Sequence, residues 1–352
     1  MLDDVAAHGA EQVALCADDD TGLRAIVAIH STALGPALGG TRFWSYDSER
    51  EALVDVLRLA RGMTYKHAVC GNDLGGGKGV IIGDARKLRT DALMLAYGRF
   101  VDRLGGRYLT AEDVGTTQAD MDLISTVTRH VTGVSEHLGG SGDPSPATAW
   151  GMVHALGAVA ERLWGSASLA ARHVTISGVG KVGADLARQL AHAGARLTIA
   201  DVRDDVVAAV ASELGAKIVA PTEAHAVECD IFSPCALGAV LNEHTIAELR
   251  CAAVCGCANN QLATDEDGDR LAMRDVLYAP DYVVNAGGVI NIAQEKTAGG
   301  YDHDRAWARI ATIHDTVARV FALADEHGVT PAEAADRLAE HRLAAATANQ
   351  PS

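Results

Sequence analysis

Apolar residues that alternate with other residues open the chain. In LRAIVAIH, residues 23–30, Leu23, Ala25, Val27 and Ile29 alternate with polar or small neighbours, and the turn DDTG separates them from the earlier apolar stretch EQVALCAD. A period of two residues is typical of a strand, so this pattern predicts a β-hairpin. Helical spacing predicts helices over 48–69 and 92–106, and RYLTAEDVGTT predicts a strand that runs into a polar loop.

The composition of the chain changes at HLGGSGDPSPATAW, residues 137–150. The glycines and prolines there predict an interdomain joint, with a hinge over 140–146. Beyond this joint, short apolar stretches alternate with alanine-rich helical ones. The expected strands are HVTISGVG, ARLTIADV, AKIVA, CDIFSPC, CAAVCGCANN and DYVVNAGG. Alternation of this kind predicts a doubly wound parallel sheet. The fold class is therefore α/β with two domains, which also suits a chain of 352 residues.

Composition narrows the range of partners. The chain has 48% hydrophobic residues and a net charge of -16, which disfavours binding to nucleic acid and to anionic membrane surfaces. No stretch is long and apolar enough to span a bilayer, and the start has acids where a signal peptide carries positive charge. Seven dispersed cysteines predict reduced thiols and a cytoplasmic location. The scattered histidines and cysteines predict no metal site.

The segment SGVGKVG, residues 177–183, carries the pattern G-x-G-x-x-G at Gly178, Gly180 and Gly183, with Lys181 and Val182 between the last two glycines. An apolar strand precedes it and a helical pattern follows, so the glycines fall where a turn must approach a pyrophosphate. Asp201 ends the next expected strand, at the distance of the carboxylate that binds the adenosine ribose. This context predicts NAD as the cofactor, with Arg203 weakening the preference over NADP.

A second glycine segment, LGGGKGVIIGD (residues 74–84), places Lys78 behind three glycines that predict a turn. Lys66 lies twelve residues earlier, and Asp113 follows an expected strand. Two lysine ammonium groups close together in a partly dry site lower each other's pKa. One of them then serves as a base in its neutral form, while the other stays charged and holds a carboxylate. Asp113 adds a proton carrier. Alone, each residue has a simpler explanation as a surface charge or a turn residue, but together they suit an α-amino acid.

Eight segments resemble one family. They are LGPALGGTRFWSY, ARGMTYKHAV, LGGGKGVIIGD, GRYLTAEDVGT, GSGDPSPATAWG, PCALG, CANNQLA and YAPDYVVNAGGVIN. In this order they are similar to the glutamate, leucine, phenylalanine and valine dehydrogenases, and closest to the valine and leucine branch. The resemblance implies a substrate-binding and oligomerisation domain over 1–142, joined by the C-terminal helix 329–352, and a Rossmann-type NAD-binding domain over 143–328. It also implies a homo-oligomer.

The same resemblance implies individual roles. Lys78 is expected to be the catalytic base, and Asp113 to handle protons at the substrate amine. Lys66 is expected to bind the substrate carboxylate with the backbone of Gly39 and Gly40. Residues expected to position the nicotinamide end of the cofactor and the substrate are Thr148, Asn260 and Asn285. The implied reaction is reversible oxidative deamination of an amino acid to a 2-oxo acid and ammonia, in a cleft that closes to exclude water.

Four aliphatic positions correspond to the residues that line the substrate pocket in relatives: Leu38, Ala111, Val289 and Ile292. None offers a polar group to a polar side chain, which disfavours glutamate and favours valine, leucine and isoleucine. Core packing is the alternative explanation for these four. The alternative functions are a phenylalanine or other aromatic amino-acid dehydrogenase, and a catalytically silent NAD-binding regulator.

Three positions depart from the family pattern. His67 stands beside Lys66 where relatives commonly have asparagine, and a charge there is expected to perturb the lysine. Gly79 replaces a small side chain after Lys78, which predicts a looser position for the base. Cys257 replaces a small alanine or serine near the expected cofactor residue Asn260.

Overall fold

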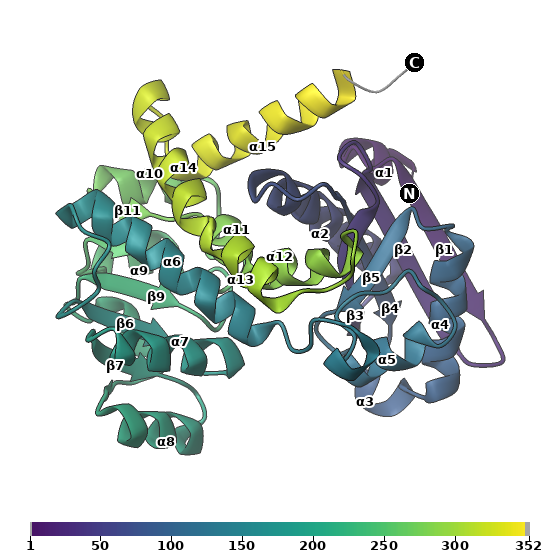
Figure 1. Ribbon diagram of the computed structural model, residues 1–352, viewed down its shortest axis with the longest axis horizontal. Coiled ribbons are helices and arrows are strands. Elements are labelled where there is room, and N and C mark those ends of the chain that lie inside the picture. The colour runs from purple at the N-terminus through teal and green to yellow at the C-terminus, as the bar shows by residue number, and fades with distance from the viewer. Residues whose placement is uncertain (1, 349–352) are drawn as a thin grey trace. The chain divides into compact units, whose positions relative to one another are not determined.

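The computed structural model describes residues 2–348 and divides them into two compact units, each with its own sheet (Figure 1). The first unit contains residues 2–143, 292–303 and 339–348, and the second contains residues 144–291 and 304–338. The α/β fold class is confirmed.

These divisions differ from the expected boundaries at 142/143 and 328/329 because of specific bonds. Residues 292–303 belong to the first unit, where Glu295 accepts hydrogen bonds from the backbone N–H groups of Gly133 and Ser141. The C-terminal helix α15 (Pro331–Ala348) is shared between the units. Asp336 accepts a hydrogen bond from Tyr282 of the second unit, whereas Arg342 bonds to carbonyls of the first.

In the first unit, five strands form a mixed sheet in the order β1-β2-β4-β3-β5. The strands are β1 (Gln12–Asp18), β2 (Leu23–Ser31), β3 (Ala37–Trp44), β4 (Gly75–Ile82) and β5 (Tyr108–Glu112). The helices are α1 (Leu2–Ala7), α2 (Glu49–Val69), α3 (Ala85–Leu88), α4 (Asp91–Arg103) and α5 (Gln118–Ser125), with short 3₁₀ turns at Glu136–Leu138 and Gln294–Lys296. The predicted hairpin is confirmed, because β1 and β2 pair in antiparallel fashion.

Strand β2 shows why the first unit has three layers, with a sheet between two layers of helices. Ile26 and Ala28 pack with apolar residues of α2, whereas Val27 and Ile29 pack with residues of α4. Since successive side chains of a strand point to opposite faces, the two helices cover opposite faces of the sheet. The sheet is thus buried on both sides where β4 and β3 pass through its middle.

The glycines before Lys78 form part of strand β4 rather than the turn that the sequence predicts. Gly76, Gly77 and Lys78 pair with β2, and Gly75 and Gly76 pair with β3, in the interior of the sheet. A Cβ on Gly76 would collide with Thr64 of α2, so the missing side chain lets the helix approach the strand. The turn prediction is wrong because glycine here serves close packing.

The second unit contains a parallel sheet in the order β11-β10-β9-β6-β7-β8. Its strands are β6 (His173–Ser177), β7 (Arg196–Ala200), β8 (Lys217–Ile218), β9 (Ile231–Pro234), β10 (Ala253–Val254) and β11 (Leu277–Tyr278). Its helices are α6 (Ser145–Trp164), α7 (Lys181–His192), α8 (Asp204–Leu214), α9 (Glu243–Glu248), α10 (Glu266–Met273), α11 (Asp281–Val284), α12 (Gly287–Ala293), α13 (His303–Ala311) and α14 (Ile313–His327), with a 3₁₀ turn at Pro221–Ala226. This strand order is that of a doubly wound dinucleotide-binding domain. Strands β7 and β8 are added on one side of β6, and β9 to β11 are added on its other side, so the strand order reverses between β6 and β9.

One detail of the second unit differs from the sequence prediction. DYVVNAGG is helical at Asp281–Val284, and the last strand is Leu277–Tyr278, because Pro280 ends the strand and Asp281 begins the helix.

The described part of the chain, residues 2–348, contains no helix long and apolar enough to cross a membrane. Across the same residues no cluster of three or more histidine, cysteine or acidic side chains is arranged to hold a metal ion. The seven cysteines are not joined in disulfides.

Candidate active site

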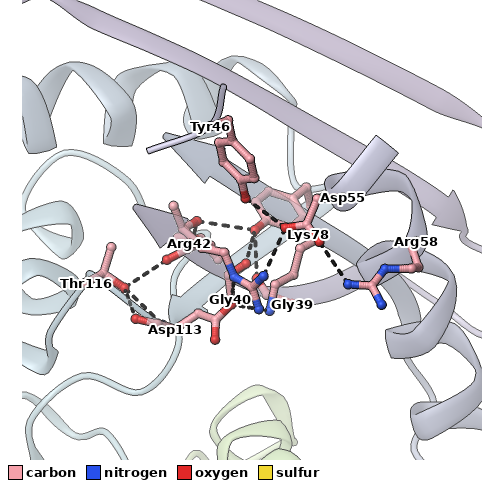
Figure 2. Close-up of polar contacts among 12 residues, drawn as sticks. Gly39, Gly40, Arg42, Tyr46, Asp55, Arg58, Lys78, Asp113 and Thr116 are labelled. Atoms are coloured by element: carbon pink, nitrogen blue, oxygen red, sulfur yellow. Dashed lines mark hydrogen bonds and ion pairs between the residues drawn. The ribbon is translucent and has the colours of Figure 1, made fainter. Parts of the chain in front are cut away.

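Lys78 and Asp113 meet at the centre of the first unit. The Lys78 Nζ atom lies 2.6 Å from Asp113 Oδ2, and the lysine side chain is only 9% exposed (Figure 2). Lys78 comes from β4 and Asp113 follows β5, two strands that lie on either side of β3. The sheet therefore brings together the two residues for which the sequence predicts proton transfer.

The loop that carries Asp113 is fixed by hydrogen bonds. The Thr116 hydroxyl accepts a bond from the Asp113 backbone N–H at 2.9 Å and lies 2.9 Å from the Thr41 carbonyl, to which it donates. A Cβ on Gly40 would lie 2.8 Å from the Asp113 Cβ, so only glycine lets β3 come this close to the carboxylate. These contacts hold Asp113 near Lys78.

Burial alone raises the pKa of Asp113, but the Lys78 ammonium and the Arg42 guanidinium outweigh this effect and lower it below its ordinary value. Asp113 is therefore ionised at neutral pH. Its Oδ2 atom faces the Lys78 ammonium at 2.6 Å. A carboxylate held ionised in this way can also accept a bond from a substrate ammonium group.

The neighbouring backbone is held by a buried set of hydroxyl groups. Tyr108 donates to the Gly39 carbonyl at 2.7 Å, and the Thr41 hydroxyl lies 2.6 Å from those of Tyr97 and Thr110. A Cβ on Gly79 would collide with the Tyr97 hydroxyl. The expectation that Gly79 leaves Lys78 loose is wrong, because these hydroxyl groups already fill the space.

Lys66 lies in the last turn of α2 and is half-buried. Its helix packs against β4, and Thr64, one half-turn earlier, faces Gly76. The contact of Lys66 with a substrate carboxylate stays a prediction, as does the part expected of the Gly39 and Gly40 backbone.

His67, next to Lys66, is fully buried, and burial lowers its pKa to about 3. The imidazole is therefore neutral at neutral pH, and the expectation that its charge perturbs Lys66 is wrong. Its Nε2 atom lies 3.3 Å from the Leu38 carbonyl, and Nδ1 lies 3.1 Å from the Asn72 amide nitrogen. A tautomer with the proton on Nε2 satisfies both contacts, so His67 supports the backbone beside Leu38 and Gly39.

Three of the four expected pocket residues belong to one apolar cluster in the first unit. Leu38, Ala111 and Ile292 are each less than 9% exposed. They pack with Leu74, Leu109, Ala293 and the flexible side chain of Met63. Val289 is half-buried in α12 and belongs to the second unit, so its place in the pocket stays a prediction.

The turn after β6 fits a dinucleotide. Gly178 has a φ of +106°, and a Cβ there would lie 2.7 Å from the Ala236 Cβ, in the loop after β9. Gly183 packs against the Gly178 carbonyl, which places α7 close to the turn. A Cβ on Gly180, in contrast, would meet nothing nearer than Arg203 at 3.7 Å, and no side chain caps α7, which begins at Lys181 and Val182. The backbone thus leaves room for a pyrophosphate at a helix N-terminus.

Asp201 follows β7, as the sequence predicts, and its Oδ2 accepts a hydrogen bond from the Val179 backbone N–H at 2.9 Å. Arg203 binds the same carboxylate through its backbone N–H at 3.0 Å and its Nε at 3.1 Å. Burial raises the pKa of Asp201, but these bonds outweigh it and lower the pKa, so the carboxylate is ionised beside the glycine turn.

The expected nicotinamide residues lie in the second unit. Asn285 donates to the Cys257 carbonyl at 3.1 Å, while its Oδ1 is buried with no hydrogen-bond donor among residues 2–348. Asn260 is exposed at a turn, and Thr148 donates to the Pro144 carbonyl at the start of α6. The unpaired Asn285 oxygen is the kind of acceptor that a nicotinamide carboxamide requires.

Cys257 lies beside this group. The neighbouring Cys235 thiol and burial raise the pKa of the Cys257 thiol, which therefore stays protonated. The effect of this departure on substrate preference stays a prediction.

Sequence reasoning missed Arg42, which forms an ion pair with Asp113, and Tyr108, which fixes the Gly39 carbonyl. A signal for Arg42 was present. It stands two residues after Gly40 on the same strand, and residues two apart in a strand share a face.

Comparison with known proteins agrees with this arrangement. Residues 10–130 match the dimerisation domain of the Glu/Leu/Phe/Val dehydrogenases, and residues 197–350 match the Glutamate/Leucine/Phenylalanine/Valine dehydrogenase domain. The chain is 52% identical to leucine dehydrogenase of Geobacillus stearothermophilus, over 95% of this chain and 90% of the relative. It is also 52% identical to valine dehydrogenase of Streptomyces coelicolor, over 96% of this chain and 93% of the relative.

A solved structure is similar as well. L-tryptophan dehydrogenase from Nostoc punctiforme matches with a TM-score of 0.86 and 41% identity, over 99% of this chain and all of that one. The resemblance found in the sequence is thus confirmed, and the chain belongs to the glutamate, leucine, phenylalanine and valine dehydrogenase family, as an amino-acid dehydrogenase.

Proposed function

We propose that the protein catalyses the reversible oxidative deamination of valine, leucine and isoleucine with NAD. The observation that carries this proposal is the Lys78–Asp113 pair, which lies in the same unit as the apolar cluster of Leu38, Ala111 and Ile292. The leucine and valine dehydrogenases at 52% identity support the same substrate class.

The substrate is recognised at three points. Lys66 and the backbone of Gly39 and Gly40 hold its carboxylate, and the Asp113 carboxylate accepts a hydrogen bond from its ammonium group. The aliphatic side chain lies against Leu38 and Ala111. An apolar surface without a hydrogen-bonding partner penalises a polar side chain such as that of glutamate.

The chemistry follows from the proton exchanges that Lys78 and Asp113 support. Dehydrogenases of this family depend on a pyridine nucleotide, whose contribution when bound is to accept hydride from the substrate Cα. Lys78, in its neutral form, takes a proton from water as that water attacks the substrate imine. Asp113 takes a proton from the substrate ammonium group before hydride transfer and returns it to the nitrogen of the carbinolamine that water addition forms. Ammonia then leaves, and the carbinolamine hydroxyl gives its proton to the Asp113 carboxylate as the substrate becomes a 2-oxo acid.

Cofactor choice rests on the second unit. Gly178, Gly180 and Gly183, with Lys181 and Val182, would hold the pyrophosphate. The ionised Asp201 would bind the adenosine ribose and repel a 2′-phosphate, which favours NAD over NADP. Thr148, Asn260 and Asn285 would hold the nicotinamide end.

We also infer that the protein is a homo-oligomer located in the cytoplasm. The match of residues 10–130 to a dimerisation domain supports self-association, which light scattering of the purified protein would measure. The hinge over 140–146 stays a prediction.

One experiment tests the central proposal. Reduced-nicotinamide absorbance would be followed with L-valine, L-leucine, L-isoleucine, L-phenylalanine, L-tryptophan and L-glutamate, each with NAD and with NADP. We expect the branched aliphatic substrates with NAD to give the highest kcat/KM. A preference for aromatic substrates, as the tryptophan dehydrogenase neighbour suggests, would keep the chemistry and contradict the pocket assignment.

Lys78→Ala is the decisive variant in this assay. Loss of a general base lowers kcat by about a hundred- to ten-thousandfold, while binding of reduced cofactor, measured by fluorescence, should be unchanged. Lys87→Ala is the matched control, because Lys87 is 80% exposed and pairs only with Asp84 among residues 2–348. Full activity in Lys78→Ala would contradict the role of the lysine.

A further inference from the structure

A row of side chains with alternating charge leads from the buried lysine to the surface of the first unit (Figure 2). Its members are Lys78, Asp113, Arg42, Asp55 and Arg58. Arg42 Nη1 lies 2.9 Å from Asp55 Oδ2, and Arg58 Nη2 lies 3.1 Å from Asp55 Oδ1. The lysine end is 9% exposed and the Arg58 end is 58% exposed.

Arg42 occupies the middle of this row and contacts both carboxylates at once. Its Nη1 donates to Asp55, while its Nε lies 3.5 Å from Asp113 Oδ2. Arg42 Nε is a buried donor that lacks a hydrogen-bond partner within the described chain, and it faces Asp113 Oδ2, which also lies 2.6 Å from the Lys78 ammonium. The guanidinium and the carboxylate lie slightly beyond bonding distance and can close into a hydrogen bond with a small movement.

The far side of Arg42 is fixed by Asp55. This carboxylate also accepts a hydrogen bond from the Tyr46 hydroxyl at 2.8 Å, so three donors converge on it. Asp55 lies on α2 and its side chain is 14% exposed. A guanidinium held at one end in this way points its Nε at Asp113 without the freedom of a surface side chain.

We propose that Arg42 is a positioning residue of this active site, which holds the Asp113 carboxylate against Lys78 and remains beside it as a cation when Lys78 is neutral. The inference rests on the proposed function, in which Lys78 loses and regains a proton. Arginine suits this role because it keeps its charge at every physiological pH. Without it, a neutral Lys78 would leave Asp113 as a buried carboxylate with no cation partner among residues 2–348.

The forked shape of the arginine side chain lets it contact two carboxylates at once. One guanidinium bridges Asp55 and Asp113 through different nitrogens, whereas the single ammonium group of lysine can serve only one of them at this spacing. Arg42→Lys therefore keeps the charge and breaks the bridge, and Arg42→Met removes both.

The test measures kcat, KM and the pH dependence of kcat/KM for the full-length variants. We expect Arg42→Met to lower kcat/KM by about ten- to a hundredfold, mostly through kcat. Arg42 lowers the pKa of Asp113, so its removal raises that pKa and moves the acidic limb of the profile to higher pH. Lys78 from β4 and Arg42 from β3 are the charged groups that face Asp113, and only Arg42 is removed. Arg42→Lys should keep the limb near its wild-type position and lower kcat by a smaller factor.

Arg50→Met is the control, since it removes the same charge from a 79% exposed arginine of α2 that pairs with Asp4. We expect its kcat and pH profile to match those of the wild type. A wild-type profile in Arg42→Met would overturn the inference. So would a loss of activity that only follows a lower melting temperature, with the acidic limb unmoved.

Lys78→Ala and Asp113→Asn separate this inference from the proposed function. If both variants are inactive while Arg42→Met behaves as the wild type, only the role of Arg42 fails. If Lys78→Ala is fully active, the proposed function fails. Should Arg42→Met not fold, Asp55→Asn releases the anchor instead, and it should move the acidic limb in the same direction by a smaller amount; an unmoved limb would overturn the inference.

Discussion

The two glycine and lysine segments, GGGKG at 75–79 and GVGKVG at 178–183, look alike in sequence and serve opposite purposes. In the first, a Cβ on Gly76 or Gly79 would collide with protein atoms of α2 or α4. In the second, Gly180 faces open space at the start of α7. The first segment uses missing side chains to admit other parts of the protein. The second does the same at Gly178 and Gly183, but at Gly180 it leaves room for a ligand.

This difference explains where each lysine lies. Lys78 is carried on a strand in the interior of a sheet and is 9% exposed, whereas Lys181 is an exposed residue in the first turn of a helix. Close packing fixes a catalytic side chain in position, while an open turn presents backbone N–H groups. A glycine-rich motif therefore acquires its function from the element that contains it.

Among the variants that test this comparison, Gly79→Ala is expected to change the free energy of unfolding most. The added Cβ would collide with the Tyr97 hydroxyl and lie 2.7 Å from Thr41 Oγ1, so it should lower the free energy of unfolding by about 1–3 kcal/mol and reduce activity. Tyr97→Phe removes the hydroxyl and should recover about 1 kcal/mol in the double variant. Urea unfolding of the two single variants and the double variant measures the coupling.

Gly62→Ala is the control for that series, because Gly62 lies in α2 with nothing within 4 Å of its added Cβ. It should raise stability by about 0.5–1 kcal/mol through helix propensity alone. Strictly additive effects of Gly79→Ala and Tyr97→Phe would show that the hydroxyl does not occupy the space of the missing side chain.

A smaller effect concerns the pH dependence of the unfolding free energy. It reports the burial of His67 in the first unit. His67 has its pKa lowered from 6.5 to about 3, so the unfolded chain binds a proton that the folded chain does not across this range. Stability contributed by the neutral imidazole is present above about pH 6.5 and is lost as the pH falls toward 3. His67→Asn should remove up to about 1.4 kcal/mol per pH unit from the slope of unfolding free energy in this window.

His244→Asn is the matched control, since this histidine is 87% exposed and its loss should leave the slope unchanged. Denaturant unfolding at a series of pH values measures both variants. Equal slopes for the wild type and His67→Asn would show that His67 is protonated in the folded protein.

The smallest effect on stability is expected from Gly180→Ala. With φ at -68° and the nearest atom 3.7 Å from the added Cβ, the change should alter the unfolding free energy by less than about 0.5 kcal/mol. The same methyl group would fill the space for the pyrophosphate and weaken binding of reduced nicotinamide cofactor by at least about tenfold. Fluorescence titration measures this affinity, and an unchanged value would place the pyrophosphate elsewhere.

Much of the fold was accessible from sequence because apolar periodicity reports burial directly. The hairpin over 12–31 and the helix over 49–69 follow from spacing alone. The prediction of a turn at the glycines before Lys78 is wrong because glycine is common both in turns and at points of close packing. DYVVNAGG was misread as a strand because its apolar residues are too few to show a period.

The site was accessible only in part. Lys78 and Asp113 could be named from the resemblance, but Arg42 gained its meaning only when the fold placed it 3.5 Å from Asp113 and 2.9 Å from Asp55. Likewise, no sequence pattern shows that Tyr108 bonds to the Gly39 carbonyl, because the two residues are 69 positions apart. Contacts between distant residues depend on the register of the strands.

The C-terminal helix α15 bonds to the end of α2, a part of the chain that is synthesised much earlier. Arg342 donates hydrogen bonds from Nη1 to the carbonyls of His67, Ala68 and Asn72, and Nη2 lies 2.8 Å from Asp73. His67 and Ala68 lie in the last turn of α2, the helix that carries Lys66, and His67 is 275 residues before Arg342. During translation, these bonds to the end of α2 can form only after Arg342 has been synthesised.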